Sequence, residues 1–187
     1  SIPDVIHHTD LKYWNRHLGL ITLENLPEQS GSIADPQIDC DDDNLPAISY
    51  IKGPVSRNLC FRYLGDQTWT GTPDTIDANV SLSRLMFDNY SSTFVVAWSR
   101  SNSDYNFYAY RTGVLQWDMK QISAAIVSAP LVSFDIDKKR GVPYFIVAQK
   151  HPMLDRFSFF EVKDDPTYSE KITEDLWVQN LANVKLM

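Results

Sequence analysis

Three stretches of the sequence repeat one order of short β-type segments and turns, and they cover residues 36–77, 81–123 and 130–173. Each stretch runs as strand, turn, strand, polar loop, aromatic-rich strand, tight turn and last strand. Pro36 and Pro130 are about two repeat lengths apart, and Trp69 and Trp117 are about one apart, so the period lies in the forties of residues. This period is typical of repeats built from four strands.

The individual segments also have the composition of β-strands. They are short, rich in β-branched and aromatic residues, and bounded by Gly, Pro, Asn, Asp or Ser. The clearest examples are residues 93–99, 106–113, 131–137, 143–149 and 156–162. Apart from a weak candidate at residues 173–187, no apolar i, i+3, i+4, i+7 pattern persists over a helix-length window. The sequence therefore predicts an all-β protein.

The stretches "DDDNLPAISY" (41–50), "DLKYW" (10–14) and "GDQTW" (65–69) resemble the blades of sialidase-like β-propellers, with a degenerate form of their Asp-box repeat. The resemblance implies a β-propeller of four-stranded antiparallel blades, in which the first strand of each unit lies innermost. With 187 residues, the chain would form a single domain over 1–187, either as about four blades or as part of a larger propeller.

The two ends of the chain do not fit whole blades. Residues 1–30 provide a partial first blade, because residues 10–26 look like the third and fourth strands of a unit. We expect the C-terminal segment 174–187 to supply an inner strand that pairs with the N-terminal strands and closes the ring. The alternative is that another chain, or another part of the same precursor, completes a larger propeller.

The acidic cluster Asp41–Asn44 has two interpretations. Asp and Asn are favoured in hairpin turns, because their side chains bond nearby backbone groups and tolerate left-handed conformations. Carboxylates are also calcium ligands, but the glycine and the terminal Glu of an EF-hand loop are absent. The matching turns of the other units do not keep three carboxylates, so we predict a turn without metal or cofactor.

Cys40 and Cys60 match no metal-ligand spacing and are interpreted as small buried hydrophobic residues.

Charge excludes some classes of partner. The chain has 24 acidic and 17 basic residues and a formal net charge of -7, which opposes binding to nucleic acid. No apolar run reaches the length needed to span a bilayer, so we predict no membrane insertion. The sequons Asn79-Val80-Ser81 and Asn89-Tyr90-Ser91 favour an extracellular or surface-associated location.

The predicted loops suggest a non-catalytic binding module. In a propeller, the loops that join second to third strands gather on one face, where polar groups and aromatic rings can hold a sugar. The predicted ligand-binding residues on this face are Arg57, Arg100, Asn102, Tyr105 and His151. The leading hypothesis is lectin-like carbohydrate recognition, and the first alternative is a protein-interaction or structural propeller within a larger assembly. A sialidase-like glycoside hydrolase is the second alternative, because arginines recur in the repeats, although no catalytic residue is predicted.

Overall fold

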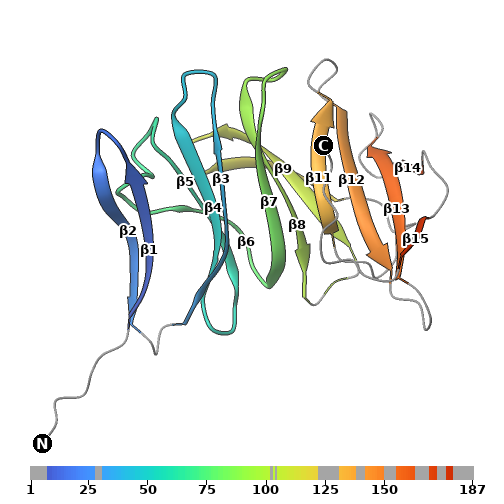
Figure 1. Cartoon of the computed structure of the whole chain (residues 1–187), viewed down its shortest axis with the longest axis horizontal. Helices are drawn as coiled ribbons and strands as arrows, with labels where there is room; N and C mark the ends of the chain where they lie inside the picture. The colour runs from blue at the N-terminus through green and yellow to red at the C-terminus, as the bar shows by residue number, and fades with distance from the viewer. Residues whose placement is uncertain are drawn as a thin grey trace, which may run out of the picture.

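The computed structural model describes residues 8–27, 31–101, 103, 105–121, 131–137, 142–149, 155–162, 169–171 and 176–178. Within these residues all regular structure is β-strand, in four antiparallel sheets. The sheets lie side by side in chain order along the long axis of the molecule, from β1 and β2 at one end to β11–β15 at the other (Figure 1). The prediction of an all-β protein is confirmed, and the described residues do not close a ring.

Each sheet comes from one continuous stretch of chain. The first sheet pairs β1 (His8–Asn15) with β2 (Gly19–Pro27). The second sheet has the order β3 (Ile33–Cys40), β4 (Pro46–Lys52), β5 (Asn58–Tyr63) and β6 (Asp74–Asp77). The third sheet has the order β7 (Val80–Asp88), β8 (Thr93–Arg100), β9 (Asn106–Gly113) and β10 (Gln116–Gln121). The fourth sheet contains β11 (Leu131–Asp137), β12 (Val142–Gln149), β13 (Asp155–Val162), β14 (Ser169–Lys171) and β15 (Leu176–Val178).

The predicted repeats correspond to the second, third and fourth sheets, and the N-terminal hairpin forms the two-stranded first sheet. The C-terminal segment differs from its prediction. Residues 176–178 do form a strand, β15, but this strand pairs with Asp155–Phe157 of β13 rather than with the N-terminal strands. The rest of the segment, residues 174–175 and 179–187, lies outside the described residues. The short pairing places β15 within the fourth sheet.

The core consists of apolar layers between successive sheets. Alternate residues of β4 point to opposite faces, and both faces are covered, so the strand is buried along almost its whole length. Between the second and third sheets the buried side chains include Ala47, Ile51, Leu59, Phe61, Phe94, Val96 and Trp98. On the other face of the second sheet, Leu11 and Leu23 of the first sheet pack with Ile48, Tyr50 and Cys60. Cys60 is buried as predicted, whereas the same prediction for Cys40 is wrong, because Cys40 is exposed.

Carboxylates of β3 fasten the second sheet to the third. Asp35 Oδ2 accepts the backbone N–H of Ser83 at 2.6 Å, and Asp39 Oδ2 accepts that of Phe87 at 2.7 Å. Strand β7 contacts both β3 and β11, so first strands of successive sheets are neighbours. Asp35 has a positive φ of 50°, at a register shift between Ala34 and Gln37. This irregularity turns the strand locally, as β-bulges do.

No helix in the described part of the chain could cross a membrane.

Candidate functional site

Arg57 and Arg100, two of the predicted ligand-binding residues, are engaged in contacts within the molecule. Arg57 donates from Nε to the carbonyl of Val80 at 2.9 Å and from Nη2 to that of Ser81 at 3.3 Å. Arg100 makes two hydrogen bonds to the Asp77 carboxylate, at 2.6 and 2.9 Å, and its guanidinium lies 4.2 Å from the centroid of the Phe107 ring. Both arginines therefore join the second sheet to the third.

The structure brings two of the predicted loops, β4–β5 and β8–β9, together at the end of the sheets where Arg57 and Arg100 lie. Asn79 links them, because its N–H donates to Ser56 O at 2.9 Å and its carbonyl accepts the Ser101 N–H at 2.7 Å. Tyr105, in the β8–β9 loop, has 36% of its surface exposed. Asn102 and His151 lie outside the described residues. Ligand binding by the five predicted residues stays a prediction.

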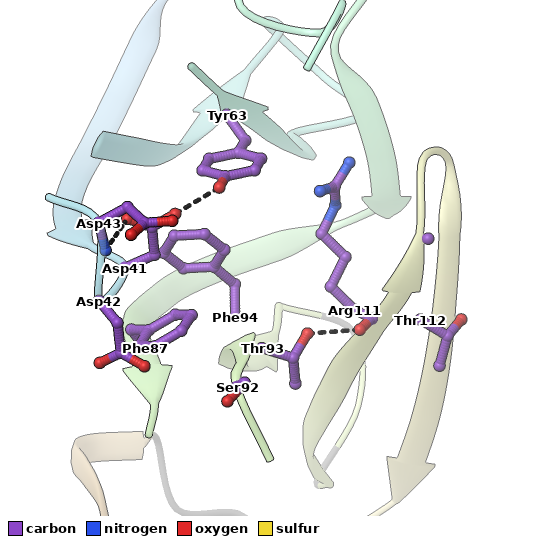
Figure 2. Close-up of a pocket in the computed structure, with 11 residues that line it drawn as sticks. Asp41, Asp42, Asp43, Tyr63, Phe87, Ser92, Thr93, Phe94, Arg111 and Thr112 are labelled. Atoms are coloured by element: carbon purple, nitrogen blue, oxygen red, sulfur yellow. Dashed lines mark hydrogen bonds between the residues drawn. The ribbon is translucent and has the colours of Figure 1, made fainter. Parts of the chain in front are cut away.

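A pocket of about 370 Å³ opens at the opposite end of the second and third sheets, near the β3–β4 and β7–β8 turns. These two turns lie at the upper end of the sheets in Figure 1, and the β4–β5 and β8–β9 loops lie at the lower end. The lining residues are shown in Figure 2 and are Asp41, Asp42, Asp43, Tyr63, Phe87, Ser92, Thr93, Phe94, Arg111, Thr112 and Gly113. They come from both sheets, so the pocket exists only when these sheets pack together.

One side of the pocket is the acidic turn, residues 41–44. Asp41 Oδ1 accepts the backbone N–H groups of Asp43 at 3.0 Å and Leu45 at 2.8 Å, while Asp41 Oδ2 accepts the Tyr63 hydroxyl. Asn44 has a φ of 61°, in the left-handed region that Asn tolerates better than most residues. The predicted hairpin turn between β3 and β4 is confirmed. Burial, together with the hydrogen bond to Asp41, raises the pKa of Tyr63 to about 12, so its hydroxyl stays protonated at neutral pH and donates the hydrogen bond to Asp41.

The other two carboxylates of the acidic turn are exposed. Asp42 Oδ1 accepts a hydrogen bond from the Asn89 side-chain amide at 2.5 Å. The described residues contain no cluster of three or more His, Cys, Asp or Glu side chains arranged to hold a metal ion. What the carboxylates can do in this arrangement is accept hydrogen bonds from a ligand.

We expect that millimolar calcium does not change the thermal unfolding temperature. Asp41 already uses both carboxylate oxygens, Oδ1 for N–H groups of the turn and Oδ2 for the Tyr63 hydroxyl, and a calcium site needs six or more oxygens. A ligand that binds only the folded state must stabilise it, so scanning calorimetry with calcium and then with a chelator is a direct test. An increase of several degrees with calcium, reversed by the chelator, would contradict the turn interpretation.

Aromatic rings form the floor beside the acidic turn. Phe94 is buried, with 3% of its surface exposed, and its ring centroid lies 5.0 Å from that of Phe87 and 5.1 Å from that of Tyr63. Figure 2 shows the two phenylalanine rings beside the acidic turn, with Arg111 on their opposite side. The partly buried Phe87 provides an apolar surface at the pocket.

Arg111 contributes little net positive charge to the pocket. Its Nη2 bonds to Asp66, and its Nε bonds to Asp74 at 3.3 Å. The guanidinium also lies 5.1 Å from the centroid of the Phe61 ring. Because two carboxylates offset this one cation, the three carboxylates of the acidic turn make the pocket electronegative.

A sialidase-like reaction finds little support in the described residues. Arg57, Arg62, Arg100 and Arg111 all bind protein groups instead of forming an open cluster for a substrate carboxylate. Tyr50 donates to Glu24 at 2.6 Å, but Tyr50 has no exposed surface. Its pKa is raised, first by burial and then by the bond to Glu24. Tyr50 is therefore a buried hydrogen-bond donor, out of reach of a substrate.

Comparison with protein-family models finds no match for this chain. Comparison with curated proteins finds no similar sequence. The candidate site thus rests on its own geometry.

The acidic turn is recognisable in the sequence, but the other residues of the pocket are not. Tyr63, Phe87 and Arg111 each lie in a separate strand, and no motif links them to Asp41. One signal in the sequence concerns these three residues. The three repeats align with one another, so corresponding strand ends are expected at the same end of the sheets. That alignment gives the end of each strand but not which side chain points into the pocket.

Proposed function

We propose that the chain is a non-catalytic binding module with β-propeller-type blades that recognises a carbohydrate in the pocket beside the acidic turn. The observation that carries the proposal is the lining of the pocket, which combines exposed carboxylates with an apolar ring surface. Asp42, Asp43, Ser92 and Thr112 offer hydrogen-bonding groups to sugar hydroxyls, and Phe87 offers a surface to the apolar face of a sugar ring. Lectin-like recognition needs this mixture and no nucleophile.

The charge of the pocket narrows the class of sugar. A ligand carboxylate or sulfate would lie near the three carboxylates of the acidic turn, and this like-charge contact costs binding free energy. Neutral and amino sugars avoid that cost. The proposed module therefore selects neutral or basic sugars over acidic ones.

We expect Asp43→Asn to reduce the affinity for the best-bound sugar by about tenfold, because a hydrogen bond to a charged group contributes about 1.5–3 kcal/mol. The first step is a glycan array that contains neutral, amino and acidic sugars, followed by calorimetric titration of the strongest ligand. Asp10→Asn is the matched control, because Asp10 is an exposed carboxylate on β1 that pairs only locally with Lys12 at 2.8 Å.

Binding of no sugar on the array would overturn the proposed function. Equal affinities for Asp43→Asn and Asp10→Asn would place the carbohydrate site elsewhere on the molecule. Preference for a sialylated or sulfated glycan would contradict the argument from charge.

A further inference from the structure

The two sequons occupy very different places in the fold. Asn89, Tyr90 and Ser91 form the turn between β7 and β8, and all three residues are exposed, with 64% of the Tyr90 surface accessible. The Asp88 carboxylate holds this turn by accepting the Tyr90 N–H at 3.0 Å and the Ser91 hydroxyl. Asn89 thus stands on an exposed hairpin tip, where its side-chain amide donates a hydrogen bond to Asp42 at 2.5 Å.

The other sequon is built into the junction between the second and third sheets. The Asn79 N–H donates to Ser56 O at 2.9 Å, and Asn79 O accepts the Ser101 N–H at 2.7 Å. Its middle residue, Val80, has no exposed surface, and the hydroxyl of Ser81 donates to Ser99 O at 3.1 Å. The Asn79 backbone is therefore fixed to two other loops, and Asn79 is only partly exposed, whereas Asn89 is exposed.

We propose that Asn89, and not Asn79, is an N-glycosylation site when the chain passes through a secretory pathway. The donor is a lipid-linked oligosaccharyl diphosphate, and a membrane transferase supplies the base. The Asn89 amide nitrogen forms a bond to C1 of the first sugar while the bond from C1 to the diphosphate oxygen breaks. One amide proton goes to the base, and the lipid diphosphate leaves.

The folded structure accommodates a glycan at Asn89 at little cost. The Asn89 amide donates one hydrogen bond, to Asp42 at 2.5 Å, and a glycosylated amide keeps one N–H for it. Two residues near Asn89 line the pocket. Asp42 accepts its hydrogen bond, and Ser92 follows it in the same turn. A glycan at Asn89 therefore stands at the pocket rim, where it limits the size of ligand that can enter.

The test is secretion of the chain, with an added signal peptide, from a eukaryotic cell. The intact mass of the secreted protein is measured before and after treatment with peptide N-glycosidase, which leaves aspartate where a glycan was attached. Peptide sequencing then maps that aspartate. The expected result is one glycan, carried on Asn89 by most molecules, with Asn79 unmodified.

Three variants sharpen the assignment. Asn89→Gln and Ser91→Ala should each lose the glycan, whereas Asn79→Gln should keep it. Mapping on the unaltered chain keeps the test valid if a variant fails to be secreted. Secreted protein without a glycan at Asn89, or with occupancy at Asn79 equal to or above that at Asn89, would overturn the proposal.

Discussion

Replacing Glu24 by alanine is expected to lower the free energy of unfolding by about 3–5 kcal/mol, the range for removing one partner of a buried ion pair. Glu24 lies on β2 with 9% of its surface exposed, and it accepts hydrogen bonds from Tyr50, Lys52 and Arg62 at 2.6, 3.0 and 2.7 Å. Arg62 is only 3% exposed, so the variant would leave a buried guanidinium without its carboxylate.

The Glu24 network joins the first sheet to the second. Arg62 also donates from Nη1 to the carbonyls of Thr68 at 2.7 Å and Gly71 at 2.7 Å, which fixes the β5–β6 loop. Loss of Glu24 therefore weakens both the packing of β2 and the order of this loop. Denaturant unfolding measures the change, with Asp10→Ala as the control. Asp10 belongs to a half-exposed pair with Lys12, and such pairs contribute about 0–1 kcal/mol.

The contribution of Glu24 to the free energy of unfolding should depend on pH. Burial alone would raise its pKa, but the hydrogen bonds from Tyr50, Arg62 and Lys52 outweigh burial and lower the pKa below the usual 4.5. A carboxylate with a lowered pKa contributes its stability above the unfolded-state pKa and loses it as pH falls through the folded-state pKa. The stability gap between the parent protein and Glu24→Ala is therefore largest at neutral pH and narrows below about 4.5. A gap that stays constant down to pH 3 would show that the carboxylate charge does not carry the effect.

The strands were predictable because local signals agree with tertiary burial. In residues 106–113, the aromatic and β-branched content predicts a strand, and the structure gives β9 over the same residues. The second and third sheets are covered on both faces, which explains why β4 and β8 read as nearly continuous apolar runs rather than alternating ones. The three repeats then indicate the three larger sheets, since each repeat forms one, while the N-terminal hairpin adds the two-stranded first sheet.

The roles of the arginines were not predictable from their spacing. Arg57, Arg100 and Arg111 recur near the ends of strands, and a recurring cation on a loop resembles a binding site. What decides their role is the position of a carboxylate or carbonyl on the neighbouring sheet, such as Asp77 for Arg100. That partner is 23 residues away along the chain, and only the packing of the two sheets brings it close.

Only the local part of the pocket could be predicted, because its other contacts also depend on how the two sheets pack. The Asp41–Asn44 turn follows from local chemistry, because Asp41 bonds to backbone groups two and four residues ahead. The contact from Asp41 to Tyr63 spans 22 residues, and the contact from Asp42 to Asn89 spans 47. Such distant contacts leave no periodic trace in the sequence.

Replacing Arg111 by methionine, which keeps much of its volume, is expected to lower the free energy of unfolding by about 3–5 kcal/mol. The side chain is only 9% exposed, and it reaches from β9 to carboxylates of the second sheet. One of these, Asp74, is 1% exposed. Asp74 keeps bonds from the Leu115 N–H and the Trp117 indole, each at 3.2 Å, but these neutral donors do not balance its charge.

Lys120→Met is the matched control for Arg111→Met, because Lys120 lies on the adjacent strand β10 and pairs with Asp118 in an exposed position. Its loss should change the free energy of unfolding by no more than about 1 kcal/mol. Guanidinium chloride titration of the two variants and the parent protein gives the comparison. Since Arg111 joins the second sheet to the third, its loss should also loosen the packing of the two sheets at the pocket. The near-ultraviolet circular dichroism of the aromatic rings should then weaken at denaturant concentrations below the main unfolding transition. Equal midpoints for Arg111→Met and Lys120→Met would mean that apolar packing alone holds the two sheets together.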